Sequence, residues 1–518
     1  MASEHCPDYS SWTPLANEFS RPKSVDDLQL AYAKENERLN KRLTEVLAEL
    51  AEAKGTTRRE QLELELVEVK EQLDKLRHQT FGDSSERRTK PSTDDKPKPA
   101  AKKTGHGPRP QPNLPIKTRL LKLAEEDRVC PRCNGRLEEI KGATEDAELI
   151  DMVRQHFLLV KQQRQKYGCG CDVHTTPAPP RHIKGGRYSL RFAVAVAVAK
   201  YADHNPLTRL CRMFGRQGLD VDSQTLWDQI EALAQHLVPA YDKLRQHILG
   251  ADVVGADETW WRLMGGKAKS TKRWWAWSLT NPDAVWHGID SSRSAKTAAK
   301  YLEGFDGTLM VDGYKAYDTM AKHESGIRLA HCWAHARRKF VEAKPNYPQC
   351  SEAIELIGQL FELDRETRDP SLLEGDAKLE AEQTRLAKRN TEARPILDRL
   401  RAWALEQRGL PKSGLRKAID YMFRYWDGLT AFLEDPYVPL DNNQTERALR
   451  GLVIGRKNHY GSRSKRGTEV AALFYSLIET AKLHDINSAD YIYTATIFAT
   501  EFGEALLPWE FAALPDSA

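Results

Sequence analysis

One segment near the C-terminal end of the chain combines a carboxylate with amide and basic side chains. It reads DNNQTERALR from Asp441 to Arg450, and GRKN follows at residues 455–458. Asp441 can cap a helix, and helical steps of three and four collect these side chains on one face: Asn442, Asn443, Glu446 and Arg450. A carboxylate between amides and an arginine suits a metal-bound phosphate. The same pattern also suits an ordinary surface helix with a salt-bridged glutamate.

Two aspartates in apolar segments offer further carboxylates. Asp257 lies in the β-branched and aromatic run 251–264, and Asp312 ends a second apolar run. Both patterns predict strands, in which a carboxylate is costly unless it binds something. Two strand carboxylates and one on a later helix would assemble a two-metal site in a fold of the ribonuclease H type. Glu258 is the rival of Asp257, but strand alternation sends its side chain to the opposite face.

The surrounding pattern predicts the sheet that positions these aspartates. Residues 273–279 and 284–289 should follow the Asp257 strand as antiparallel neighbours, 294–302 should form a crossover helix, and 327–332 should be the last strand. The tryptophans of this region are expected to pack in the core or on the sheet rather than stack on bases.

Five ordered motifs raise the specificity of the pattern: ADET at 256–259, VDGY at 311–314, CWAHARRKF at 332–340, DNNxxERAL from Asp441, and GRKN at 455–458. Together they closely resemble the transposases of the insertion-sequence sixty-six family, over residues 25 to 505. The resemblance implies a DNA transposase of the aspartate-aspartate-glutamate type. Such a protein binds the terminal inverted repeats of a bacterial insertion sequence and catalyses metal-dependent DNA strand cleavage and strand transfer. The resemblance also implies target DNA, a homo-oligomer and small companion proteins of the same element as partners.

In this interpretation Asp257, Asp312 and Glu446 hold two Mg²⁺ or Mn²⁺ ions. Contacts with DNA, or support of Glu446, are expected from these side chains: His335, Arg337, Arg338, Asn442, Asn443, Arg447, Arg450, Arg456, Lys457 and Asn458. Two other functions stay open. A non-catalytic DNA-binding regulator derived from a transposase would have lost one ligand, and a metal-dependent endonuclease without strand transfer would share the whole site.

Residues 189–237 predict a helix-turn-helix motif, with a short helix at 206–214 and a capped helix from Ser223. Base edges would be contacted by Ser223, Gln224 and Thr225, and phosphates by Arg209 and Arg212. A purely structural helical hairpin is the alternative.

Residues 25–79 predict a helix with heptad spacing in two blocks. The first contains Leu39, Leu43, Val46, Leu50 and Ala53, and the second, shifted by two positions, contains Leu62, Leu66, Val69, Leu73 and Leu76. The helix either dimerises with a discontinuity or folds back as a hairpin at Gly55. We favour dimerisation, because bringing two element ends together needs a multimer.

Four cysteines predict a structural zinc site: Cys130, Cys133, Cys169 and Cys171. Only one residue separates the last two, so His174 could replace one of them. Four reduced cysteines packed as small apolar residues are the other interpretation. The Pro- and Lys-rich residues 80–118 predict a flexible basic linker.

The chain has 518 residues, of which 40% are hydrophobic and 29% charged, with a net charge of +4. This length predicts several domains, and no apolar run approaches the roughly 20 residues that a membrane span needs. We therefore expect a cytoplasmic, nucleoid-associated bacterial protein with no membrane partner. The predicted fold is multidomain α+β: a coiled coil at 25–79, linker 80–118, zinc module 119–185, helix-turn-helix region 186–245, ribonuclease H-like core 246–346, all-α insertion 347–439, catalytic core helix with basic loop 440–466, and C-terminal helical element 467–505.

Overall fold

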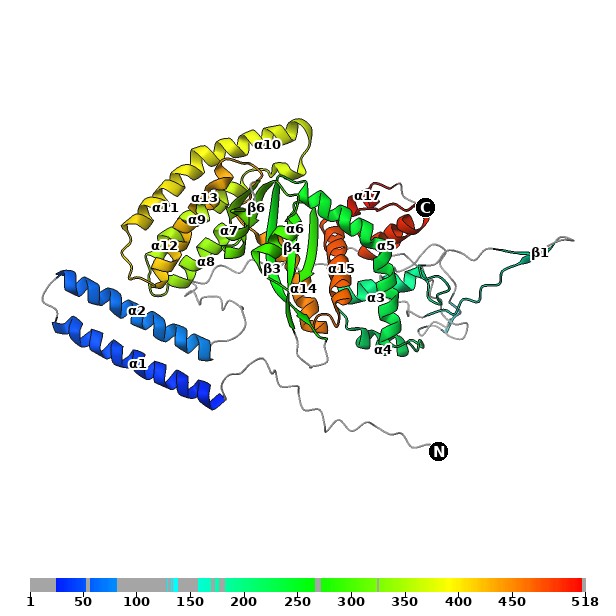
Figure 1. Ribbon diagram of the computed structural model, residues 1–518, viewed down its shortest axis with the longest axis horizontal. Coiled ribbons are helices and arrows are strands. Elements are labelled where there is room, and N and C mark those ends of the chain that lie inside the picture. Colours follow the sequence, from blue (N-terminus) through cyan, green and yellow to red (C-terminus); the bar gives the residue numbers. More distant parts are fainter. Residues whose placement is uncertain are drawn as a thin grey trace. The chain divides into compact units, whose positions relative to one another are not determined.

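The computed structural model describes residues 25–52, 56–81, 157–168, 173–176, 182–265, 272–323 and 326–514, with a few positions between 128 and 137. Figure 1 shows a mixed α+β protein with one large sheet. The described residues outside 83–155 belong to one compact unit.

The central sheet has five strands in the order β5-β4-β3-β6-β7. β3, β4 and β5 form an antiparallel meander, whereas β6 runs parallel to β3 and β7 parallel to β6. The predicted strand pairings are therefore confirmed. The strands are β3 (Val253–Leu263), β4 (Lys272–Asn281), β5 (Ala284–Asp290), β6 (Gly307–Val311) and β7 (Ile327–His331).

Aromatic side chains fill the space between the sheet and the crossover helices. Trp277 of β4 is buried and packs edge-on against Tyr317, with Tyr301 close by. The prediction that tryptophans pack rather than present open stacking faces is confirmed for Trp261, Trp277 and Trp286, which are all buried. The two helices on this face are α6 (Ala295–Tyr301) and α7 (Lys315–Ala321).

Two helices after the insertion complete the core. α14 (Asn443–His459) crosses the other face of β3, and α15 (Lys465–Leu483) lies along β5. The β5 backbone N–H groups of Val285 and His287 donate to the hydroxyls of Thr480 and Ser476 of α15. α15 therefore satisfies polar groups that an edge strand would otherwise leave unpaired.

The region predicted as helix-turn-helix shares this core. Its last helix continues to Leu249, beyond the predicted end at Leu237, and its buried side chains join the hydrophobic cluster of the sheet. The region is thus not a separate hydrophobic body, and the DNA-reading role of its helices stays a prediction. The helices are α3 (Leu190–Tyr201), α4 (Leu207–Gly215) and α5 (Ser223–Leu249), joined in the same cluster by α16 (Ser488–Ile497); α17 (Pro508–Ala512) packs beside α15 and α16.

The chain between β7 and α14 is helical in every regular element, as predicted. A second hydrophobic cluster forms here, and Met310 of β6 and Ala330 of β7 belong to it. The insertion is therefore anchored to the sheet through its own core. Its α-helices are α8 (Trp333–Ala343), α9 (Cys350–Arg365), α10 (Gly375–Lys388), α11 (Arg394–Glu406), α12 (Gly414–Arg424) and α13 (Trp426–Thr430).

The two predicted heptad blocks form separate helices, α1 (Val25–Glu52) and α2 (Thr56–Phe81), which pack on each other. Leu39, Val69 and Leu73 make a small buried cluster, and Arg42 Nε donates to Glu65 Oε1 at 2.9 Å. The structure thus has the fold-back hairpin, the alternative that the sequence left open. Dimerisation through these helices stays a prediction.

The remaining N-terminal predictions fall mostly outside the described residues. These include Cys130, Cys133, Cys169, Cys171 and the linker beyond Phe81. β1 (Lys166–Gly168) and β2 (Val173–Thr175) form a short antiparallel pair, in which His174 lies opposite Tyr167. The zinc site stays a prediction. Among the described residues, no helix is long and apolar enough to cross a membrane.

Candidate active site

Strand alternation separates the two neighbouring acidic residues of β3. Asp257 lies on the face that Gly255 presents to α14, and Glu258 lies on the opposite face. Glu258 is buried there, where it accepts hydrogen bonds from Arg293 Nε and from the Tyr317 hydroxyl, each at 2.6 Å. Its carboxylate is fully engaged on the side of α7, so Asp257 is the β3 carboxylate that faces α14.

The register of the sheet places Asp312 beside Asp257. Gly255 of β3 is paired with Met310 of β6 in a parallel ladder. Asp257 lies two residues after Gly255, and Asp312 lies two residues after Met310, directly beyond the end of β6, so both project from the same face. Asp312 Oδ1 accepts the Tyr314 backbone N–H at 2.8 Å, which fixes the turn after β6.

Glu446 lies in the first turn of α14. Asn442 is the residue before the helix, and Asp441 Oδ1 accepts the Asn443 N–H at 3.0 Å. Asn442 does not share an exposed face with Glu446, because its side chain is 2% exposed and its Nδ2 donates to the Ala256 carbonyl at 2.9 Å. Asn442 therefore joins α14 to the strand that carries Asp257, and its contact with DNA stays a prediction.

The charges of the three carboxylates act on one another. Burial, together with the negative charges of Glu258, Asp312 and Glu446, raises the pKa of Asp257 to about 8. Side chains that are far apart in the sequence are thus close enough to oppose ionisation of Asp257. Carboxylates with such raised pKa values are frequent at functional sites, so this cluster is a candidate site.

His335 of α8 adjoins the cluster. Its Nε2 lies 3.6 Å from Glu446 Oε1, which is buried and has no hydrogen-bond partner. Burial lowers the pKa of His335, although the charge of Glu446 acts in the opposite direction. His335 therefore lies where it can hold the Glu446 side chain in place.

The side chains have not closed into a coordination sphere. Within the described residues, no group of three His, Cys, Asp or Glu side chains is arranged closely enough to hold a metal ion. The donor set is nevertheless one of hard oxygen ligands, and a buried carboxylate oxygen without a partner is costly. A divalent cation would remove both the mutual repulsion and that cost.

Most of the predicted DNA-contacting side chains near the site are accessible. Arg338, Arg447, Arg450, Lys457 and Asn458 are exposed, and Arg337 and Asn443 are partly buried. Arg456 is the exception. It is 8% exposed, lies 3.7 Å from the centre of the Trp260 ring and donates to Thr259 Oγ1. Arg456 therefore joins α14 to β3, and its contact with DNA stays a prediction.

In the predicted helix-turn-helix region, Arg209, Arg212 and Gln224 are exposed, while Ser223 and Thr225 are partly buried. Asp222 caps the start of α5, because its side chain accepts the Thr225 N–H at 2.7 Å. Gln224 Nε2 donates to Asp228 at 2.8 Å. The exposed side chains are compatible with the predicted role and do not test it.

Sequence reasoning missed a buried polar network behind Glu446. Thr445 and Thr280 share a hydrogen bond at 2.7 Å, and Thr445 also donates to Asn442 Oδ1 at 2.7 Å. Threonines are common on strands and helices, so neither residue type gave a signal. Only the contact between α14 and the sheet reveals them.

The fold and the site together define a class of mixed α+β protein that gathers carboxylates from two neighbouring strands and a later helix. A family model described as Transposase IS66 family matches residues 185–470, which cover the sheet, the insertion and α14. The chain belongs to this family.

Relatives of similar length occur in Sinorhizobium fredii (strain NBRC 101917 / NGR234). "Uncharacterized protein y4jD" is 32% identical over 418 residues, which cover 76% of this chain and 80% of the relative. "Uncharacterized protein y4qI" is 28% identical over 536 residues, which cover 99% of this chain and 95% of the relative. The similarity therefore extends beyond the region matched by the family model.

Proposed function

We propose that the protein is a DNA transposase of the aspartate-aspartate-glutamate type that cleaves and joins DNA at the terminal inverted repeats of its element. The observation that carries the proposal is that Asp312 and Glu446 lie close enough to Asp257 for their charges to add to burial and to the charge of Glu258, which together raise the pKa of Asp257 to about 8. Membership of the Transposase IS66 family supports the same conclusion.

The topology supports a ribonuclease H-like core. An antiparallel meander of β3, β4 and β5 is extended on the β3 side by β6 and β7. The carboxylates lie on the first strand of the meander, just after the first parallel strand, and on the later helix α14. This arrangement supports the proposal of a two-metal site.

Asp257, Asp312 and Glu446 are the residues that would hold Mg²⁺ or Mn²⁺. When bound, such ions polarise the scissile phosphate and the attacking oxygen. The protein's own contribution is to hold three carboxylates against their repulsion, with His335 beside Glu446 and the exposed Arg447, Arg450 and Lys457 placed for backbone phosphates. The side chains must draw together for binding.

The chemistry needs no covalent protein intermediate. Attack by water breaks the bond between phosphorus and the 3′ oxygen, leaving a 3′ hydroxyl and a 5′ phosphate. That hydroxyl then attacks a phosphodiester of target DNA, and the displaced 3′ oxygen leaves with a proton. The first step hydrolyses a phosphodiester bond, and the second replaces one phosphodiester bond with another. Neither step requires an oxidant or a nucleotide cofactor.

Recognition of the ends is assigned to the exposed side chains of α4 and α5, among them Arg209, Arg212 and Gln224. Assembly of two ends requires a homo-oligomer, and companion proteins of the same element are proposed partners. A structural zinc held by Cys130, Cys133, Cys169 and Cys171, or by His174 in place of one cysteine, belongs to the same proposal.

The test is cleavage and joining of a labelled duplex that carries the inverted repeats flanking the coding sequence, with Mg²⁺ or Mn²⁺. Wild type should release a 3′ hydroxyl and form joined product, and Asp312→Asn should do neither. Asp376→Asn, which changes an exposed aspartate of α10, is the matched control and should behave as wild type. Cleavage without joined product would favour an endonuclease. Tight end binding without either product, even with companion proteins added, would contradict the proposal in favour of a regulator.

A further inference from the structure

A directional hydrogen-bond chain connects the sheet to the turn that carries Glu446. The Thr445 hydroxyl donates its single proton to Asn442 Oδ1 at 2.7 Å, so the hydroxyl of Thr280 must be the donor in the 2.7 Å contact with Thr445. Asn442 Nδ2 in turn donates to the carbonyl of Ala256, the residue before Asp257. The chain thus runs from β4 through α14 to β3.

These groups are sealed from water. Thr280 and Asn442 are each 2% exposed, and Thr445 is 1% exposed. Buried hydrogen bonds of this kind cannot be replaced by water when one partner is removed, so they hold a specific geometry. The next residue along α14 is Glu446.

Gly255 lets the helix come this close. A Cβ atom there would lie 2.3 Å from Thr445 Oγ1 and 2.9 Å from Asn442 Oδ1. No side chain larger than hydrogen fits between the strand and the first turn of α14. At this first turn the strand and the helix therefore meet through polar contacts, whereas Leu449 and Leu452 further along α14 pack in the hydrophobic core.

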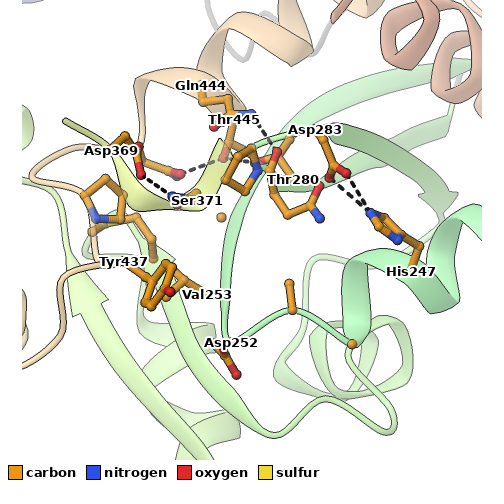
Figure 2. A pocket seen from close by; sticks show the side chains of 18 of the residues that line it. His247, Asp252, Val253, Thr280, Asp283, Asp369, Ser371, Tyr437, Gln444 and Thr445 are labelled. Carbon is orange, nitrogen blue, oxygen red and sulfur yellow. Dashed lines mark hydrogen bonds and ion pairs between the residues drawn. The ribbon is translucent and has the colours of Figure 1, made fainter. Parts of the chain in front are cut away.

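The other side of this turn is hollow. A cavity of about 640 Å³ is lined by Gly255, Thr280, Asn442 and Thr445, and by residues of the insertion such as Ser371 and Tyr437. Figure 2 shows Thr445 and Thr280 joined at its wall, with Ser371 and Tyr437 across the space. None of the three proposed catalytic carboxylates lines the cavity. The first turn of α14 is therefore not packed tightly on the cavity side. The hydrogen bonds of Thr280, Thr445 and Asn442 hold it in position instead.

We propose that Thr445, Thr280 and Asn442 are positioning residues that set the distance of Glu446 from Asp257 and so determine how strongly the site binds a divalent cation. The inference rests on the proposed function only for the identity of the metal site. Its basis is the network itself: Ala256 and Asp257 are adjacent on β3, and Thr445 and Glu446 are adjacent on α14. Without these hydrogen bonds the first turn of α14 could shift. Each carboxylate would remain, but Glu446 would lie further from Asp257.

The experiment compares Thr445→Val, which keeps the shape but loses the hydroxyl, with Thr445→Ser, which keeps the hydroxyl. Thr480→Val is the matched control, because Thr480 is also fully buried and its hydroxyl also joins a helix to a strand, at Val285 of β5. Two readouts are measured on the full chain: the Mn²⁺ concentration that gives half of the metal-induced rise in melting temperature, and the Mn²⁺ concentration that gives half-maximal DNA cleavage.

Loss of a group that orients metal ligands typically weakens metal binding or activity about 10- to 100-fold. We expect Thr445→Val to need about 10-fold more Mn²⁺ in both readouts, Thr445→Ser to restore the wild-type value, and Thr480→Val to lower the melting temperature without changing the Mn²⁺ requirement.

If Thr445→Val needs the same Mn²⁺ concentration as wild type, the positioning role is overturned while the transposase proposal stands. The positioning role is also overturned if Thr480→Val raises the requirement as much as Thr445→Val does. If wild type binds Mn²⁺ without cleaving DNA and Thr445→Val binds it more weakly, the positioning role is supported and the transposase proposal fails. A wild type that shows neither metal-induced stabilisation nor cleavage overturns both.

Discussion

Asp257 and Glu258 show how adjacent carboxylates acquire different tasks from their surroundings. Glu258 accepts hydrogen bonds from Arg293 and Tyr317 on one face of β3, whereas Asp257 meets other acids on the opposite face. The side chain with a cationic partner is structural. Burial and the neighbouring acids favour the protonated form of Asp257, with a pKa of about 8.

The raised pKa of Asp257 predicts a pH-dependent stability. The folded state keeps the proton up to about pH 8, whereas an aspartate in the unfolded chain loses it near 4. The folded state thus binds more protons between these values, and this group's contribution to stability falls as the pH rises through that window. Without divalent metal, the melting temperature of wild type should fall more from about pH 5 to about pH 8 than that of Asp257→Asn. If the melting temperatures of the two proteins changed equally between about pH 5 and about pH 8, the raised pKa of Asp257 would be contradicted.

His335 should affect cleavage through Glu446. Because its Nε2 lies 3.6 Å from Glu446 Oε1, His335→Ala should lower the single-turnover cleavage rate about 10- to 100-fold and leave end binding nearly unchanged. His323→Ala, the control, removes an exposed histidine just after α7 and should change neither the cleavage rate nor end binding. A loss of end binding equal to the loss of rate would instead assign His335 to a DNA phosphate.

The close approach of β3 and α14 is the element-level feature on which the site depends. Three of the first side chains of this turn use polar contacts with strands: Asn442 with Ala256, Thr445 with Thr280, and Gln444 with the carbonyl of Asn281. A helix held by directional bonds keeps its rotation and translation, which hydrophobic packing alone specifies less narrowly.

Gly255→Ala tests this approach. The added Cβ meets Thr445 Oγ1 at 2.3 Å, so α14 or β3 must shift, and overpacking of this kind costs about 1 to 3 kcal/mol. We expect a lower melting temperature and loss of metal-dependent cleavage. Gly358→Ala, in the interior of α9 with open space around it, is the control and should be stabilising by up to about 1 kcal/mol. Unchanged cleavage in Gly255→Ala would show that the spacing is not critical.

Across the whole molecule, the features that could be predicted from the sequence were those that depend on residue periodicity within an element and on the order of elements along the chain. Strand alternation separated Asp257 from Glu258, and the order of apolar runs predicted the sheet pairing around Asp312. Side-chain contacts between different elements could not be predicted from the sequence pattern. Asn442 and Arg456 looked like exposed polar residues of a helix, yet each turns toward β3 to satisfy a backbone carbonyl or stack on Trp260.

Two longer-range features also escaped the sequence. α5 continues past Pro239 because its apolar face joins the core of the sheet, a reason that local signals do not contain. The spacing of the two heptad blocks is compatible with both a dimeric coiled coil and a hairpin. Only tertiary contacts, such as that between Arg42 and Glu65, distinguish the two structures.

Buried histidines predict acid sensitivity of the whole protein. Burial lowers the pKa of His287 and of His459 to about 3 and that of His331 to about 4. An unfolded histidine binds a proton near pH 6.5, so stability is fully present above that value and is lost as the pH falls toward 4. The melting temperature should drop in this range, and His287→Leu, which removes a fully buried ring, should lessen the drop. A flat profile would mean that these rings are not buried in solution.

The most direct test of the account is whether the three carboxylates act as one metal-dependent unit. Single-turnover release of the 3′ hydroxyl from pre-bound DNA ends would be measured with Mn²⁺ for wild type, Asp257→Asn, Asp312→Asn and Glu446→Gln, beside the affinity of each protein for the same DNA. The account predicts that each variant binds the ends nearly as tightly as wild type but does not cleave them, and that a double variant is no worse than a single one. Full cleavage by any one of the three variants would contradict the site.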